Sequence, residues 1–125
     1  MEYLASYQNV LRDRILSAKP EMLMVMLYEG MITRVKQAQE YFRTAQTIRC
    51  KEAAIKAMNI ASALMDHLNL EEGGEPAKNL ERLYAYIVSE LVQSTRVSDP
   101  SKHFLNVLSV LSPLHESWQK LAERN

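Results

Sequence analysis

Apolar residues recur every three or four positions over most of the chain, which is the spacing of one face of an α-helix. The first long stretch begins at Pro20, where a proline suits a first helical turn, and Glu21 behind it would face the positive end of the helix dipole. Its apolar positions are Leu23, Met26, Leu27, Met31, Val35, Ala38 and Phe42. This pattern predicts the first long helix.

Three further stretches keep the same period. The second follows the polar run RTAQTIRC, where no glycine or proline marks the boundary; its apolar positions are Ala54, Met58, Ala61, Leu64, Met65 and Leu68. The third is expected to open at Pro76 and continues through Leu80, Leu83, Tyr84, Ile87 and Leu91. The fourth follows the cap-and-proline pair Asp99 and Pro100, with Phe104, Val107, Leu111, Leu114, Trp118 and Leu121 in register.

The stretch LNLEEGGEPAKNL, residues 68–80, separates the second and third helices and holds two of the three glycines. Glycine readily adopts the positive φ with which many helices end. We therefore expect Gly73 to end the second helix and Pro76 to start the third.

Four amphipathic segments of roughly 20 residues, joined by short connections, each need to bury one apolar stripe. No strand-like alternation competes with this pattern. The sequence therefore predicts an all-α, antiparallel up-down four-helix bundle over residues 17–125, with an additional short amino-terminal segment or helix, residues 1–16, packed on it.

The first 16 residues are too apolar for an ordinary tail. Tyr3, Tyr7, Leu11 and Ile15 lie along one helical stripe. One interpretation is a short fifth helix packed permanently on the bundle. The other is a segment docked in a groove that a partner also uses, and periodicity does not separate the two.

Composition excludes several classes of function. The 15 basic and 15 acidic residues cancel, so the strong positive charge of a nucleic-acid or anionic-membrane binder is missing. The longest uncharged apolar run, residues 22–28, is far shorter than the roughly 20 residues of a membrane span. The chain starts without signal-peptide order and has one cysteine, so we expect a cytoplasmic protein without nucleic-acid binding or membrane insertion.

The residue types that carry chemistry form no recognisable site. None of the histidines His67, His103 and His115 follows a glutamate at the spacing used by di-iron bundles, so we expect no metal and no cofactor. His67 could be a phosphotransfer residue, but a histidine near a helix end more often complements the dipole. Cys50 has basic neighbours that could lower its pKa, although an ordinary thiol is favoured.

Four arginines, Arg34, Arg43, Arg82 and Arg96, could converge on an anionic substrate, but arginines on polar helix faces are usually solvated. No phosphate-binding loop, catalytic triad or paired-cysteine motif is present. We therefore predict no enzyme activity.

The number and placement of the apolar residues are more informative. Most of the seven methionines lie between Met22 and Met65, and methionine repacks readily around different neighbours. The stretch Met22 to Tyr28 is apolar almost all round, wider than the stripe a bundle helix requires. A well-buried central helix would explain this, but so would grooves that accept the helices of another chain.

Several motifs carry a resemblance to a known family. The stretch SAKPEMLMVMLYEGMI, residues 17–32, resembles the opening of the flagellar secretion chaperones of the FliS family, and Tyr7 with Gln8 is similar to their amino-terminal element. LNLEEGGEPAKNLERLYAYI resembles the family's Leu-Asn, Gly-Gly-Glu, Ala-x-Asn-Leu and Leu-Tyr-x-Tyr order, and Trp118 also fits. The resemblance covers essentially the whole chain.

The resemblance implies a cytoplasmic chaperone that binds the disordered carboxyl-terminal region of flagellin, prevents premature filament polymerisation and delivers flagellin to the flagellar type III export apparatus. It also implies that residues 1–16 cap the client surface until flagellin displaces them. An export-gate component and a regulatory protein of the flagellar system are conceivable further partners, for a monomer or weak homodimer. The residues expected in the client surface or its cap are Tyr3, Tyr7, Gln8, Leu11, Leu27, Tyr28, Leu68, Leu70, Asn79, Leu80, Tyr84 and Ile87.

The chain departs from the family pattern at three places. Lys19 stands where a serine would cap the first helix, Glu29 replaces an aspartate before Gly30, and Pro76 occupies a position that is usually aliphatic. The alternative function is a non-enzymatic regulatory or scaffold bundle that binds another partner and shares only the architecture.

Overall fold

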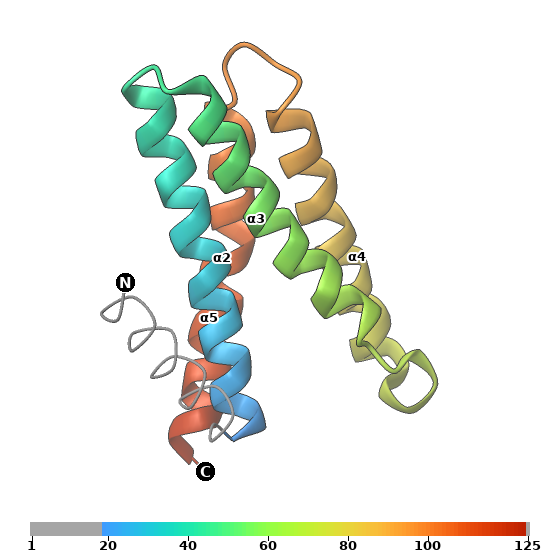
Figure 1. The fold of residues 1–125 in the computed structure, drawn as a ribbon. Coiled ribbons are helices and arrows are strands. Elements are labelled where there is room, and N and C mark those ends of the chain that lie inside the picture. The colour runs from blue at the N-terminus through green and yellow to red at the C-terminus, as the bar shows by residue number, and fades with distance from the viewer. Residues whose placement is uncertain (1–18, 125) are drawn as a thin grey trace, which may run out of the picture.

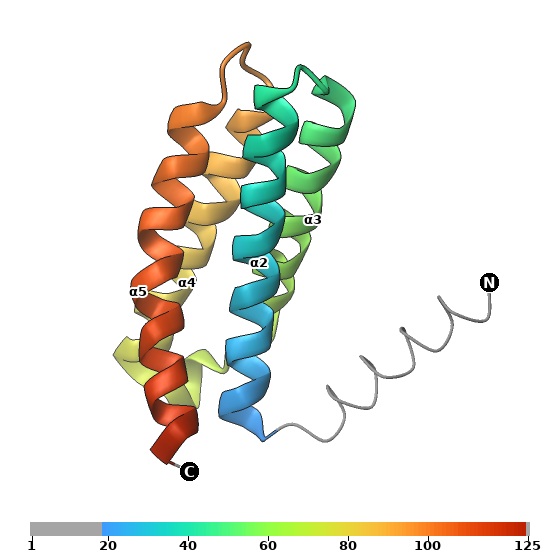
Figure 2. The ribbon, with the colours of Figure 1, turned by 90° about the vertical axis from the view of Figure 1, so that its left-hand side faces the viewer.

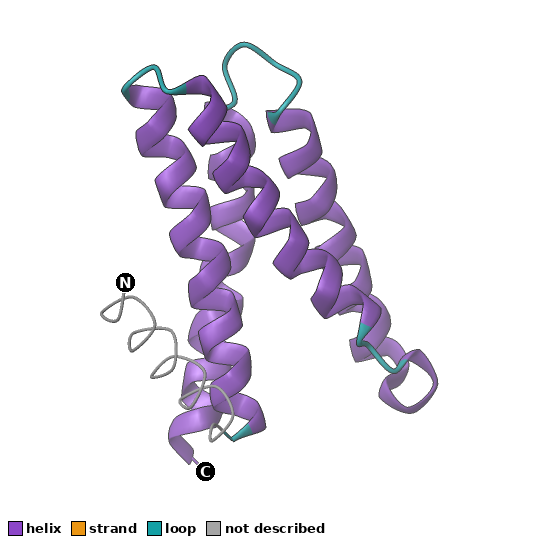
Figure 3. Ribbon diagram, viewed as in Figure 1, coloured by secondary structure: helices purple, strands orange, loops and turns teal. Residues whose placement is uncertain are grey.

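The computed structural model describes residues 19–124, and they form four long helices with no strand among them (Figure 3). The helices are α2 (Pro20–Arg43), α3 (Thr47–Asp66), α4 (Leu70–Ser94) and α5 (Ser101–Arg124). They run alternately up and down, and each packs against two neighbours: α2 and α4 both lie against α3 and α5 (Figures 1 and 2). The predicted antiparallel four-helix bundle is confirmed, whereas the expected amino-terminal cap falls outside the described residues.

The core fills the centre of the bundle with large side chains from three helices and small ones from the fourth. Tyr28, Met31 and Val35 of α2 are fully buried, as are aromatic and aliphatic residues of α4 and α5. Helix α3 contributes only small buried side chains, namely Cys50, Ala53, Ala54, Ala57 and Ala61. Small side chains allow helices to approach closely, so the fully buried face of α3 packs tightly, while its larger Met58, Ile60, Leu64 and Met65 are only partly buried against the core.

The predicted start of the first helix is confirmed. Pro20 occupies the first turn of α2, with Glu21 beside it. Lys19 is the N-cap residue and makes no side-chain cap hydrogen bond, as its replacement of a serine led us to expect. At the α4–α5 connection, the Asp99 carboxylate accepts a hydrogen bond from the Ser101 amide at 3.0 Å, which confirms the predicted cap.

The break between α3 and α4 differs from the prediction. α3 already ends at Asp66, with His67 as its C-cap, so Gly73 does not end that helix. A first helical turn already begins at Leu70, where the Asn69 side chain accepts a hydrogen bond from the Glu72 amide. Gly74, with a non-helical φ of 56° and ψ of −142°, separates this turn from the long part of α4, which restarts with Pro76 in its first turn, as predicted.

The two adjacent glycines of α4 have different roles. Gly74 is the residue with a positive φ, 56°, and it kinks α4 just before Pro76. Gly73 instead meets a packing limit, because a Cβ atom there would lie 2.5 Å from the Ala77 Cβ. Gly74 therefore bends the chain near the start of α4, and Gly73 allows close packing against Ala77. Neither glycine ends α3.

Candidate client-binding groove

An apolar groove of about 580 Å³ opens between α2 and α3. In Figure 1 these helices lie close together at the top and diverge toward the bottom, where α2 begins and α3 ends. The groove occupies this diverging end, which we call the open end. Its lining is almost entirely apolar and consists of Leu23, Met24, Leu27, Asn59, Ile60, Ala63, Leu64 and His67.

Helical periodicity places these residues on facing surfaces. Leu23 and Leu27 of α2 are four residues apart, as are Ile60 and Leu64 of α3, so each pair forms a ridge along its helix. The ridges are partly buried, because the helices diverge too far for the side chains to cover one another. The surface left between them has the width and chemistry that suit the apolar face of another helix.

His67 closes the lower edge of the groove. Its Nδ1 donates a hydrogen bond to the Ala63 carbonyl at 2.8 Å, and the residue is the C-cap of α3. The imidazole thus satisfies a carbonyl that the end of the helix would leave without a partner. This is a structural role, as the position near a helix end suggested.

Beneath the surface, two tyrosines join helices that are not neighbours in the bundle. The hydroxyls of Tyr28 on α2 and Tyr84 on α4 are 2.7 Å apart, and their rings meet edge to face at 6.3 Å. Burial raises the pKa of both hydroxyls above the usual range, while hydrogen bonds from Tyr84 and Trp118 oppose the shift at Tyr28. Both therefore stay protonated, and the pair fixes the core on which the groove rests.

Of the eight expected surface residues that the structure describes, only Leu27 lines the groove. Three of them, Tyr28, Tyr84 and Ile87, are fully buried in the core and present no surface in the free bundle. Tyr3, Tyr7, Gln8 and Leu11 lie outside the described residues.

The other four of the eight lie near the α3–α4 break. Leu68 and Leu80 pack partly buried against the core, and Leu70 is exposed. Asn79 is exposed and accepts a hydrogen bond from Arg82 at 2.8 Å. These four residues therefore fix or flank the start of α4, and the groove is built from different residues.

Sequence reasoning missed seven of the eight groove residues, namely Leu23, Met24, Asn59, Ile60, Ala63, Leu64 and His67. The signal was partly present, because the all-round apolar stretch from Met22 to Tyr28 supplies the α2 side. On α3 the helical spacing of apolar residues predicted that Leu64 faces the core. That spacing contains no information on the divergence of α3 from α2 near Leu64.

The remaining reactive side chains have local partners. Burial raises the pKa of the Cys50 thiol, against a smaller opposing effect of Lys51, which agrees with the ordinary thiol that the sequence favoured. His103 lies 2.7 Å from the Glu90 carboxylate, which ties α5 to α4. His115 lies 3.3 Å from the Glu29 carboxylate, which ties α5 to α2.

The four arginines that could have met an anionic substrate do not converge. Arg43 pairs with Glu40 on its own helix, and Arg82 bonds to Asn79 on α4. Within residues 19–124, no group of three or more histidine, cysteine or acidic side chains is arranged to hold a metal ion. In the same range, no helix has the length and hydropathy to cross a bilayer.

A four-helix bundle with an open apolar groove is an architecture suited to binding the helices of other polypeptides. Over residues 3–125 the chain matches the family described as "Flagellar protein FliS". The chain therefore belongs to the FliS family, which confirms the resemblance seen in its motifs.

Similar proteins come from several bacteria. The flagellar secretion chaperone FliS of Salmonella typhimurium is 31% identical over 97% of this chain and 90% of its own length. The protein of the same name from Vibrio cholerae is 29% identical over 94% of this chain and 87% of its own length. FliSB of Pseudomonas aeruginosa, also named a flagellar secretion chaperone, is 32% identical over 81% of each chain. Family membership supports a role in flagellar secretion.

Proposed function

We propose that this chain is an export chaperone that binds the carboxyl-terminal region of flagellin in the bacterial cytoplasm. The observation that carries the proposal is the apolar groove between α2 and α3, in a chain of the FliS family. Its lining suits an amphipathic client helix, with anchors at helical spacing seated between the ridges of Leu23 and Leu27 and those of Ile60 and Leu64.

The energetics favour a long and apolar contact. A disordered client loses several kcal/mol when it becomes ordered, so it must bury a large apolar area to bind at all. A groove of about 580 Å³ accommodates several large side chains, each worth roughly 1.5–3 kcal/mol when fully buried. Binding and release of this kind need no chemical step, and the proposed role is therefore non-enzymatic.

Holding the client in the groove has two consequences in this proposal. The apolar face of the flagellin segment is covered, so it does not pack against other flagellin molecules and start a filament. The covered segment also remains separate from the rest of the client, so the complex can deliver flagellin to the flagellar type III export apparatus. Release then follows when the apparatus takes over the bound segment.

The amino-terminal segment, residues 1–16, has a proposed part in this cycle. The groove begins in the first turns of α2, at Leu23 and Met24, only a few residues after that segment ends. We propose that Tyr3, Tyr7 and Leu11 cover the groove until the client replaces them. Covering it keeps an apolar patch from promoting aggregation. Deletion of residues 1–16 should leave the bundle folded and tighten client binding, whereas loss of the fold would make the segment structural.

Titration of a carboxyl-terminal flagellin peptide into the full chain tests the main proposal. We expect heat release and a gain of helix by circular dichroism at tens of micromolar peptide. Ala63→Glu and Ala63→Lys place opposite charges in the apolar groove, and each should weaken binding by roughly thirtyfold, about 2 kcal/mol.

The matched controls are Ala85→Glu and Ala85→Lys, at an exposed alanine of α4 outside the groove. They should bind the peptide like the parent chain. Absence of both heat and helix gain would contradict the proposed function. Equal affinities for the Ala63 and Ala85 variants would place the client elsewhere on the bundle.

A further inference from the structure

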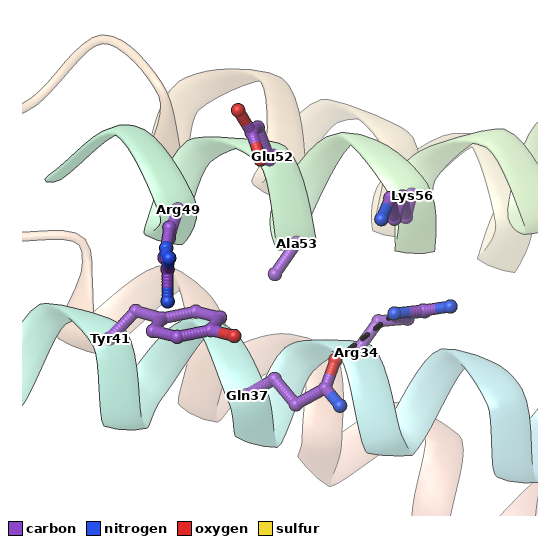
Figure 4. A pocket seen from close by; sticks show the side chains of 7 residues that line it. All are labelled: Arg34, Gln37, Tyr41, Arg49, Glu52, Ala53 and Lys56. Carbon is purple, nitrogen blue, oxygen red and sulfur yellow. Dashed lines mark hydrogen bonds between the residues drawn. The ribbon is translucent and has the colours of Figure 1, made fainter. Parts of the chain in front are cut away.

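A second pocket lies between the same two helices, toward the α2–α3 connection at the other end of the bundle, which we call the closed end (Figure 4). Its volume is about 130 Å³, and its lining is largely polar: Arg34, Gln37, Tyr41, Arg49, Glu52, Ala53 and Lys56. In Figure 4, Arg49 extends from α3 toward Tyr41 on α2, while Arg34 and Lys56 lie on facing helices at the other end of the pocket. We call it the basic pocket.

The three cations of the basic pocket have no anionic partner within the described part of the chain. The ion pairs formed among the described residues do not include Arg34, Arg49 or Lys56. Arg34 donates only to the neutral Gln37 amide, at 3.3 Å. Glu52 is the single carboxylate in the lining, so the pocket keeps a net positive charge at neutral pH.

The start of α3 adds to this charge and lacks the usual compensation. A helix amino terminus carries a partial positive charge, so acidic residues stabilise the first turn and basic ones oppose it. α4 follows this rule with Asn69 as its cap and two glutamates in its first turn. α3 has no acidic residue there, and its N-cap residue Gln46 makes no side-chain cap hydrogen bond.

Helix α3 instead places Arg49 in its first turn. A residue that destabilises its own helix is often retained because it has a function, so Arg49 marks a candidate functional position.

The wider charge distribution points the same way. The formal charge of the whole chain is zero, yet its middle is divided into a basic and an acidic half. The segment 33–56, around the closed end, has cations Arg34, Lys36, Arg43, Arg49, Lys51 and Lys56 against Glu40 and Glu52. The segment 57–90 reverses the balance, with Asp66, Glu71, Glu72, Glu75, Glu81 and Glu90 against Lys78 and Arg82. The cations of segment 33–56 therefore give the α2–α3 side of the closed end a local positive field.

We propose that the basic pocket binds an acidic segment of a second protein, whose carboxylates pair with Arg34, Arg49 and Lys56. Guanidinium groups favour carboxylates because two parallel N–H groups match two oxygens. The pocket is too small and carries too few cations to follow a phosphate backbone, and Glu52 within it would repel one. The basic pocket and the groove share no lining residue, so the second protein binds while the groove is filled.

The test uses the full chain and a fluorescent eight-residue peptide of alternating glutamate and glycine. Fluorescence anisotropy should show binding that weakens as salt is raised. The double variant Arg34→Gln/Arg49→Gln should bind about tenfold more weakly, since it loses two exposed charge pairs. The matched control, Lys120→Gln/Arg124→Gln, makes the same charge change on α5 near the opposite end and should bind like the parent chain.

Three results would overturn the inference. Equal affinity of the two double variants would show only general attraction to positive charge. Tighter binding of an oligothymidine of matched charge than of the peptide would indicate a nucleic-acid surface. Loss of peptide binding in Ala63→Lys would show that the groove and the basic pocket are one site. Circular dichroism of each variant should show the parent helix content, because Arg49, Lys120 and Arg124 are exposed and Arg34 is only partly buried.

Discussion

The two ends of the α2–α3 surface are built from the same pair of helices and yet offer opposite chemistry. At the open end, Leu27 and Ile60 face each other across an apolar groove. At the closed end, some two helical turns away along α2, Arg34 and Lys56 face each other across the basic pocket. Helix spacing and side-chain chemistry thus change together along one interface, which is why we propose a different ligand for each end.

The spacing between α2 and α3 depends on what α3 contributes at each level. Toward its start, α3 buries Cys50, Ala53, Ala54 and Ala57, whose small side chains let α2 come close. Toward its end, the larger Ile60 and Leu64 stay only partly buried. The closed end is therefore packed through the small side chains of α3, whereas at the open end the larger Ile60 and Leu64 line the groove.

The largest effect is expected when the two surfaces are tested against each other. Ala63→Lys should lower the affinity for the flagellin peptide by roughly thirtyfold and change the affinity for the acidic peptide by no more than about twofold. Arg34→Gln/Arg49→Gln should do the reverse, with about a tenfold loss for the acidic peptide alone. Both peptides would be titrated against both variants by the same method. Parallel losses in one variant would mean that the two ends act as a single surface.

A smaller effect is expected at the kink of α4 beside the open end. Gly74→Ala should lower the free energy of unfolding by about 1–3 kcal/mol, because alanine is strained at the positive φ of 56° that Gly74 adopts. Urea denaturation followed by circular dichroism measures the change. Acidic-peptide binding at the far end should not change.

Gly30→Ala is the matched control for that variant, since it makes the same chemical change in the interior of α2. The added Cβ would lie 3.4 Å from Ile60 Cδ1, an ordinary contact, so we expect a gain of about 0.5–1 kcal/mol. Opposite signs for the two variants would support the conformational argument. A loss at both positions would instead mean that α2 and α3 tolerate no added methyl group.

The smallest effect concerns the charge at the start of α3. Arg49→Gln removes a cation from the positive end of the helix and should raise the free energy of unfolding by about 0.3–1 kcal/mol. Arg124→Gln removes a cation from the last turn of α5, where the dipole favours it, and should have the opposite sign. A loss of stability in Arg49→Gln would show that Arg49 stabilises the free bundle, and would weaken its assignment to a partner.

Much of the fold was readable from particular residues. Pro20 and the pair Asp99 and Pro100 mark helix starts because a missing amide donor and a capping carboxylate have local effects. The break between α3 and α4 was placed in the right stretch, but the wrong glycine received the positive φ. Packing against the Ala77 side chain requires a glycine at position 73, while the positive φ falls on Gly74, and local propensity does not distinguish two adjacent glycines.

The turn between α2 and α3 shows a different limit. Ala45 adopts a φ of 60° there, although alanine is not a residue that signals such a turn. The backbone bonds at its two sides, from the Thr44 amide to Glu40 and from the Gln46 amide to Tyr41, hold it in place. Helix ends and packing imposed this conformation, so the sequence located the gap only approximately.

The sequence by itself determined that the chain forms four amphipathic helices, which residues face the core in most of α4 and α5, and that its motifs match the FliS family. These properties follow from periodicity and local chemistry, which act over a few residues. Only the tertiary structure decided that Tyr28 and Tyr84 meet in the core, that α2 and α3 diverge into a groove, and that Arg34, Arg49 and Lys56 share a pocket. Each of these depends on how far apart two helices lie, and that distance is set by side chains many residues apart in the sequence.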